Sequence, residues 1–85
     1  AQQEAENNYK EFLLQQRNNN RLEAQRLLNE GDIFYRAEAY DDAEQRYQAA
    51  IDRLQPRAEE ADMNITLERA DSSIIREAQR KLDLR

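Results

Sequence analysis

The chain of 85 residues contains no cysteine, no histidine and no tryptophan, and it has only one glycine and one proline. Without cysteine there are no disulfides and no thiolate metal ligands, and without histidine the commonest general base is missing. The sequence also has no glycine-rich phosphate loop and no calcium-loop spacing. We therefore expect no enzymatic activity, with no catalytic residues, no metal and no cofactor.

Long apolar runs and a basic surface are also missing. No stretch approaches the roughly 20 apolar residues that span a bilayer, so we expect no direct membrane insertion. The net charge is −5, and basic residues are interleaved with acidic ones. Nucleic-acid binding needs a concentrated basic face, so we expect no nucleic-acid partner. The class of partner that remains is protein.

Charged residues make up 36% of the chain and hydrophobic residues 39%, which is typical of a mostly helical, heavily solvated protein. We expect one all-α module over residues 1–85. Its core should be small, because a chain of this size buries only about 60–65% of its unfolded surface. The cysteine-free composition is compatible with the periplasm, which we favour, and with the cytoplasm.

The central stretch, residues 21–56, has the pattern of two antiparallel helices joined by a tight turn at residues 38–40. One face of the first helix, residues 20–38, follows the i, i+3, i+4, i+7 spacing with Ala24, Leu27, Leu28, Gly31 and Phe34 or Tyr35. The facing stripe of the second helix consists of Ala43, Tyr47, Ala50, Ile51 and Leu54. We expect a helical hairpin that packs through Leu27, Gly31, Phe34, Ala43, Tyr47 and Ala50.

Two local features of the hairpin lead to further expectations. Gly31 lies inside a helix, where glycine costs roughly 1 kcal/mol relative to alanine. We therefore expect it to allow a close approach to Ala43 and Ala50. Asp41, with Glu44 three residues later, has the spacing of a capping box, so we expect Asp41 to cap the second helix.

One set of residues in this hairpin follows the order and spacing of a known repeat: Gly31, Phe34, Tyr40, Ala43, Tyr47, Ala50 and Pro56. The set resembles one tetratricopeptide repeat, whose pattern is W-x2-L-G-x2-Y…A-x3-F…P over about 34 residues. Leu27 stands at the tryptophan position, Glu30 replaces the leucine before the glycine, and Pro56 comes one residue late. The resemblance covers less than half of the chain.

The resemblance implies a scaffold that binds other proteins and has no catalytic chemistry. In this family the first helix of a repeat lines a concave groove. By that resemblance the candidate partner groove here consists of Gln25, Leu28, Asn29, Asp32, Tyr35 and Arg36. Family members that capture a terminal carboxylate use Lys, Arg and Asn on this surface, and Asp32 argues against such a ligand.

The N-terminal flank, residues 1–17, is predicted to be an amphipathic helix with an apolar face that includes Tyr9, Phe12 and Leu13. This face either packs within the module or serves self-association. The run of asparagines at residues 18–20 favours caps and turns, so we expect a break there. The alternative is one continuous helix over residues 2–38, which would be a structural coiled coil.

The C-terminal part, residues 57–85, is expected to contain a helix over residues 57–70 and a last helix over residues 73–84, capped within residues 71–73. Residues 74–78 repeat the order of residues 27–31, with two bulky aliphatics, a glutamate and a small residue. The last helix therefore resembles the first helix of a truncated second repeat. A rival alignment places Ala78 at the second-helix alanine, with Leu82 four residues later.

Together these features predict a non-catalytic scaffold of tetratricopeptide type that associates with itself, as a dimer or higher homo-oligomer, within a larger assembly. A narrower hypothesis is the periplasmic N-terminal region of a bacterial outer-membrane secretion protein, similar to a secretin. The alternative function is a structural coiled-coil or oligomerisation segment.

Overall fold

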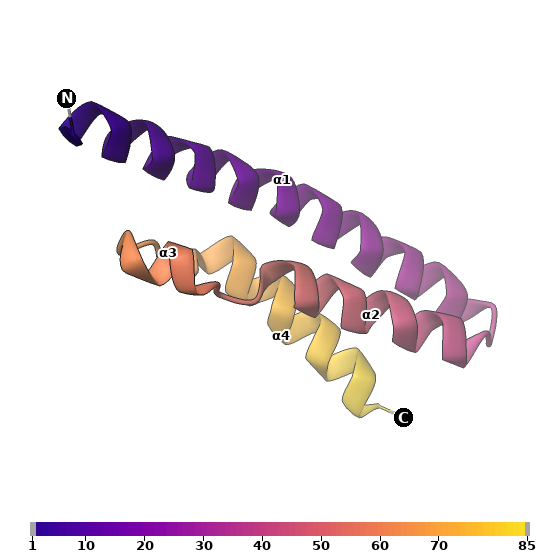
Figure 1. Cartoon of the computed structure of the whole chain (residues 1–85). Helices are drawn as coiled ribbons and strands as arrows, with labels where there is room; N and C mark the ends of the chain where they lie inside the picture. Colours follow the sequence, from indigo (N-terminus) through magenta and orange to yellow (C-terminus); the bar gives the residue numbers. More distant parts are fainter. Residues whose placement is uncertain (1, 85) are drawn as a thin grey trace.

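The computed structural model describes residues 2–84, with side chains from Glu4 onward, and shows an all-α protein (Figure 1). The four helices are α1 (Gln2–Arg36), α2 (Tyr40–Leu54), α3 (Ala58–Asp62) and α4 (Arg69–Asp83). The described part of the chain contains no strand, which confirms the predicted fold class. The molecule is elongated, with extents of 55 × 17 × 17 Å, because α1 runs along its whole length.

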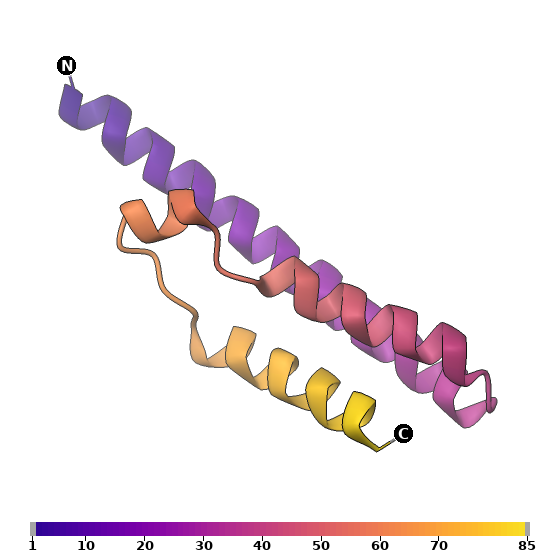
Figure 2. The ribbon, with the colours of Figure 1, turned by 60° about the horizontal axis from the view of Figure 1, so that its bottom comes forward.

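The hairpin is formed by α2 and the C-terminal half of α1, which lie antiparallel (Figures 1 and 2). The turn between them is a Schellman motif. The N–H of Ala39 donates to the carbonyl of Phe34 at 2.9 Å, and the N–H of Glu38 donates to that of Tyr35 at 3.1 Å. Glu38 adopts φ 63°, the left-handed conformation that this motif requires and that glycine normally fills.

The main core lies between α1, α2 and α4. Five of the six residues predicted to pack the hairpin are buried, and Phe34 is half-buried against the same core: Leu27, Gly31, Phe34, Ala43, Tyr47 and Ala50. The remaining buried members of the cluster are Ala24, Leu28, Ile51, Leu54, Ile74 and Ala78. The last two of these residues belong to α4. This helix packs mainly on α2 and to a smaller extent on α1.

Gly31 allows a close approach between the two helices, but its partner is not an alanine. A Cβ atom at position 31 would lie 2.6 Å from Cε1 of Tyr47, and the three nearest atoms all belong to that ring. Tyr47 lies between Ala43 and Ala50 along α2, and its ring crosses the backbone of α1 at the glycine. The phenol donates a hydrogen bond of 2.6 Å to Asp32 Oδ1. Burial, followed by this hydrogen bond, raises the pKa of Tyr47.

The expected break at residues 18–20 is wrong, and α1 continues from Gln2 to Arg36 across the predicted boundary between flanking helix and hairpin. Asn18 and Asn19 are exposed, whereas Arg17 and Arg21 on either side are tied to α3 and α4 by ion pairs. These tertiary contacts override the weak helix propensity of the asparagines. The continuous helix, considered above as an alternative to the hairpin, coexists with it.

Two helix starts also differ from expectation. The N-cap of α2 is Ala39 and the helix begins at Tyr40, so Asp41 lies in the first turn. There its negative charge interacts favourably with the positive end of the helix dipole. The last helix begins at Arg69 with Glu68 as N-cap, and Asp71 accepts the backbone N–H of Glu68 at 3.2 Å as the other half of a capping box.

The predicted helix over residues 57–70 is wrong, because α3 comprises only five residues. A second Schellman motif stops it: the N–H of Ile65 donates to the carbonyl of Glu60 at 2.8 Å, and Asn64 adopts φ 59°. Ile65 is buried, which anchors the chain after the turn. The segment that follows contains no helix and leads to α4.

We expect Gly31→Ala to destabilise the fold, although alanine is the better helix former. The added Cβ clashes with a ring that is 1% exposed, and overpacking of this kind costs about 1–3 kcal/mol. Asn19→Ala on the exposed side of the same helix should be neutral or slightly stabilising. Urea unfolding followed by circular dichroism measures both, and equal stability of the two variants would contradict the close contact.

We also expect Glu38→Gly to stabilise the hairpin. A non-glycine residue in the left-handed conformation costs about 1 kcal/mol or more, part of which is offset by the greater freedom of glycine in the unfolded chain. Ala37→Gly is the matched control, because Ala37 does not have a positive φ and glycine there only adds freedom. The two variants should shift the thermal midpoint in opposite directions, and a loss of stability in both would contradict the assignment.

Candidate functional site

A buried ion cluster determines where α3 and α4 lie relative to α1. Arg17, only 5% exposed, uses all three of its guanidinium nitrogens. Its Nε donates to Asp71 Oδ2 at 3.1 Å, its Nη1 to Glu60 Oε2 at 2.7 Å, and its Nη2 to the carbonyl of Leu54 at 3.1 Å. One side chain of α1 thereby contacts the end of α2, the short helix α3 and the first turn of α4.

Arg21, one turn further along α1, completes the cluster. Its Nε donates to Asp71 Oδ1 at 2.6 Å and its Nη2 to Glu68 Oε2 at 2.9 Å. Burial alone raises the pKa of Asp71, but the hydrogen bonds from Arg21 and from the N–H of Glu68, with the charges of Arg21 and Arg17, outweigh it and lower that pKa. The hydrogen bond with Asp71 likewise raises the pKa of Arg21. The cluster therefore holds Asp71 ionised.

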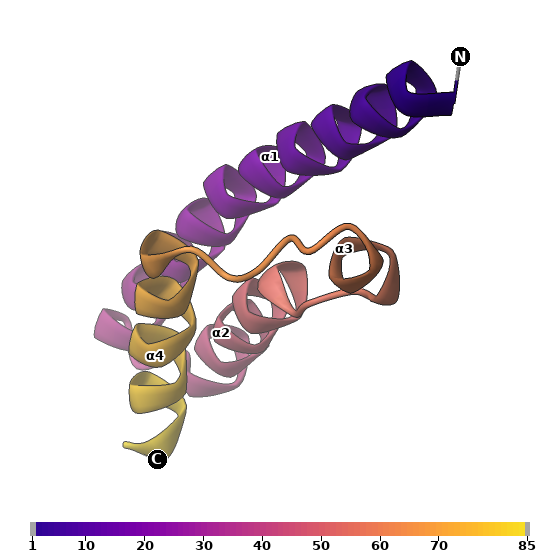
Figure 3. The same cartoon turned by 90° about the vertical axis from the view of Figure 1, so that its left-hand side faces the viewer.

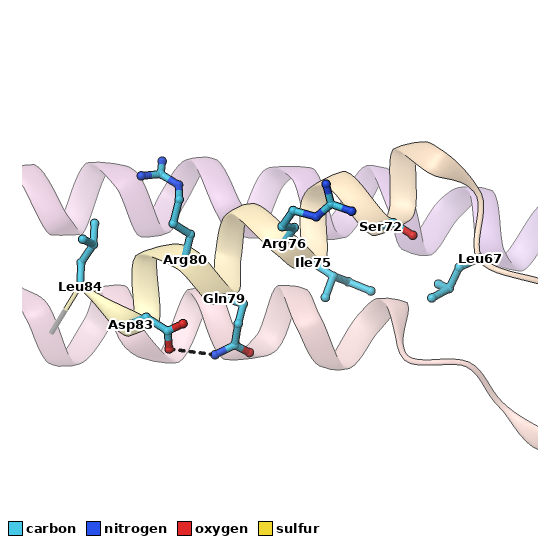
Figure 4. Close-up of a pocket in the computed structure, with 8 residues that line it drawn as sticks. All are labelled: Leu67, Ser72, Ile75, Arg76, Gln79, Arg80, Asp83 and Leu84. Atoms are coloured by element: carbon cyan, nitrogen blue, oxygen red, sulfur yellow. Dashed lines mark hydrogen bonds between the residues drawn. The ribbon is translucent and has the colours of Figure 1, made fainter.

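The face of α4 that points away from the core carries the candidate site. Ile74 and Ala78 face inward and are buried, whereas a shallow groove of about 590 Å³ follows the outer side (Figure 4). We call this feature the α4 groove. It is lined by Leu67, Ser72, Ile75, Arg76, Gln79, Arg80, Asp83 and Leu84.

The surface of the α4 groove is mostly apolar, with cations beside it. Leu67 and Leu84, at its two ends, are 36% and 58% exposed, and Ile75 is half-buried between them. Arg80 pairs with Glu77 at 2.6 Å, while Arg76 makes no ion pair with any described residue. The groove thus offers apolar contacts together with a guanidinium that is available for a carboxylate.

A second exposed apolar surface lies at the opposite end of the molecule. Residues 4–12 of α1 are exposed throughout, and the N-terminal end of α1 projects past α3 (Figure 3). We call these residues, 4–12, the N-terminal arm. Tyr9 and Phe12 are 43% and 57% exposed. Leu13, predicted with them as part of a self-association face, is instead buried within the chain and is not available to a partner.

The six residues expected to form a partner groove do not share one open surface. Gln25, Asn29 and Arg36 are exposed, while Leu28 belongs to the core. Asp32 and Tyr35 are half-buried beneath α4, where Lys81 lies 3.5 Å from Asp32 and 6.0 Å from the ring centre of Tyr35. Tyr35 also packs edge-on against Tyr40 at 5.3 Å. The fold divides the expected groove because α4 covers half of it.

Sequence reasoning missed both the ion cluster and the α4 groove. A signal for the cluster is present, since Arg17 and Arg21 continue the helical face that includes Leu13, Ala24 and Leu28. Two arginines on a face otherwise directed at the core indicate buried acidic partners. The groove has no comparable signal, because its apolar residues come partly from outside α4 and follow no helical period.

No group of acidic side chains in the described residues is arranged to hold a metal ion. Among the same residues, no helix is both long and apolar enough to cross a membrane. Comparisons with protein-family models, with curated proteins and with solved structures find no match to this chain.

We expect Asp71→Asn to destabilise the protein by about 3 kcal/mol at neutral pH, because it removes the buried carboxylate that two arginines share and leaves only Glu60 for Arg17 and the exposed Glu68 for Arg21. The matched control is Glu77→Gln, which breaks an ion pair on the exposed side of the same helix and should change stability little. Urea unfolding at pH 7 measures both. Similar losses in the two variants would show that the cluster is not a stabilising contact.

We also expect the effect of Asp71→Asn on stability to depend on pH. The pKa of Asp71 is lowered in the fold from its ordinary 3.8, so the unfolded chain binds the proton first. Asp71 contributes fully to the free energy of unfolding at pH values above its pKa in the unfolded chain. This contribution is lost as the pH falls through its lower pKa in the folded protein. The stability difference between the natural protein and Asp71→Asn should therefore shrink below about pH 4. A constant difference from pH 7 to pH 3 would contradict this.

Proposed function

We propose that this protein is a non-catalytic helical module of tetratricopeptide type that binds another polypeptide through the α4 groove. The observation that carries the proposal is the uncovered, mostly apolar groove on a helix that the ion cluster holds in a fixed position. Contiguous exposed apolar surface of this kind marks interaction sites. Nothing within the described fold covers it (Figure 4).

The packing of the helices supports a repeat of this type. Gly31 lets the ring of Tyr47 lie against α1. Ala43 and Ala50, one turn on either side of Tyr47, are buried and have small side chains that allow the two helices to pack closely. The next long helix, α4, packs back mainly onto α2. In repeat proteins each helical pair covers the previous one and leaves a face for the next element. The outer side of α4 has the character of such a face.

The shape and charge of the groove favour one kind of ligand, an amphipathic helix with acidic residues beside its apolar stripe. Leu67, Ile75 and Leu84 lie along the groove and would contact the apolar stripe of a ligand helix at points about two to three helical turns apart. Arg76 and Arg80 would pair with carboxylates of the ligand. This mode of binding differs from the addition of a strand to a sheet edge and from the capture of a peptide's terminal carboxylate.

A second candidate function is a structural oligomerisation segment, and one observation favours it. α1 is a single helix over Gln2–Arg36, and Tyr9 and Phe12 on its N-terminal arm are exposed. In that case arms would pair side by side as a coiled coil. The two candidates differ in whether the α4 groove takes part in binding.

A selection experiment tests the leading candidate. The protein is immobilised and probed with a displayed library of amphipathic helical peptides that vary in charge. We expect enrichment of peptides with acidic flanks whose binding is lost with Leu67→Asp/Leu84→Asp. The control variant is Leu22→Asp, because Leu22 is 68% exposed and does not line the α4 groove. Enriched peptides that bind both variants equally would exclude the α4 groove as the site.

A further inference from the structure

We propose that the polypeptide that occupies the α4 groove is the N-terminal arm of a second copy of this chain. This inference rests on the proposed function of the groove and names its ligand. The arm is an exposed surface that is helical, apolar on one side and acidic, which are the properties that the groove requires.

The arm fits within the length of the groove and agrees with it in contact chemistry. The nine exposed residues of the arm span about 14 Å of helix, and α4 with 15 residues spans about 22 Å. Ala5, Tyr9 and Phe12 follow one another at helical spacing on the exposed side of the arm. Aromatic side chains of this kind are the usual anchors of protein interfaces, because they bury a large area at little cost in side-chain entropy.

Their charges are complementary. The arm carries Glu4, Glu6 and Glu11 against the single Lys10, whereas the groove is lined by Arg76, by Arg80, which also pairs with Glu77, and by the single acid Asp83. Glu6 lies on one flank of the Tyr9 and Phe12 stripe and Glu11 on the other, as expected from 100° per residue. A second copy therefore brings carboxylates to a groove whose Arg76 has no ion-pair partner among the described residues.

The geometry requires that the contact be made between copies. The arm and the C-terminal end of α4 lie at opposite ends of the molecule (Figures 1 and 2). α1 is continuous from Gln2 to Arg36, and α4 is fixed to its middle at Arg17 and Arg21. The arm of one chain therefore cannot bend back into its own groove. Because arm and groove are different surfaces, copies associate head to tail, either as a reciprocal pair or as an open chain.

The test mixes two variants of the 85-residue chain that carry different defects. The arm variant, Tyr9→Ser/Phe12→Ser, keeps its groove, and the groove variant, Leu67→Asp/Leu84→Asp, keeps its arm. All four positions are at least one-third exposed, and thermal unfolding checks that both variants fold. Sedimentation velocity then gives the mass of each protein alone and of the equimolar mixture. We expect each defect to weaken self-association by about tenfold or more, and the mixture to restore a species of twice the monomer mass.

Every other outcome overturns the inference. Self-association of the groove variant alone would show that arms pair with arms, and self-association of the arm variant alone would show that grooves pair with grooves. Two monomeric variants that do not complement each other, or a monomeric natural protein, would show that the arm is not the ligand. Peptides selected by the groove in the library experiment would then keep the proposed function valid, whereas their absence would remove both.

A charge exchange gives a second, independent readout. Arg76→Glu/Arg80→Glu should weaken self-association, and combining it with Glu6→Arg/Glu11→Arg in the same chain should restore it. The matched control exchanges charge outside the groove with Arg53→Glu, because Arg53 is exposed on α2 and lies outside the α4 groove. Restoration requires that the two sets of charges face each other in the complex, so failure of the combined variant to recover would contradict the pairing.

Discussion

Asp71, buried at the start of α4, accepts hydrogen bonds from Arg17 and Arg21 of α1, and the rest of the structure depends on this pairing. Arg17 extends the same contact to Glu60 and to the carbonyl of Leu54. Burying ions is costly, and the cost is offset only when every donor and acceptor is satisfied. In the described residues no buried side-chain nitrogen or oxygen lacks a hydrogen-bond partner. Apolar packing brings α4 onto α2, and the cluster then sets how far along α1 it begins.

The cluster also explains the shape of α1. Arg17 and Arg21 flank the three asparagines, and the contacts on both sides keep the backbone helical through a sequence that favours turns in isolation. The rod that results projects the N-terminal arm away from the core. A single set of ion pairs thus connects the position of the α4 groove with the exposure of the arm at the other end.

Much of the hairpin could be predicted from the sequence, because its apolar period is regular from Ala24 through Leu54 and Gly31 marks a close contact. The partner of Gly31 could not, since helical spacing does not say which side chain of α2 crosses it. The ends of α3 depend on Asn64, which adopts a left-handed conformation only because buried Ile65 holds the chain beyond it. The start of α4 depends on Asp71, which the sequence presents as an ordinary capping residue and the fold uses as a buried counter-ion. The α4 groove was beyond prediction because Leu67, in the preceding segment, supplies one end of it.

The exposure of residues 4–12 has a consequence for how tightly the arm can be held. Because its side chains are exposed, this segment gains little free energy from tertiary packing, and it opens locally at a lower free energy than global unfolding. Asn7 and Asn8 lower its intrinsic helicity, and any partner must supply the free energy that keeps the segment ordered. Substitutions at positions that do not contact the partner therefore change the affinity, because they change the fraction of free molecules in which this segment is helical.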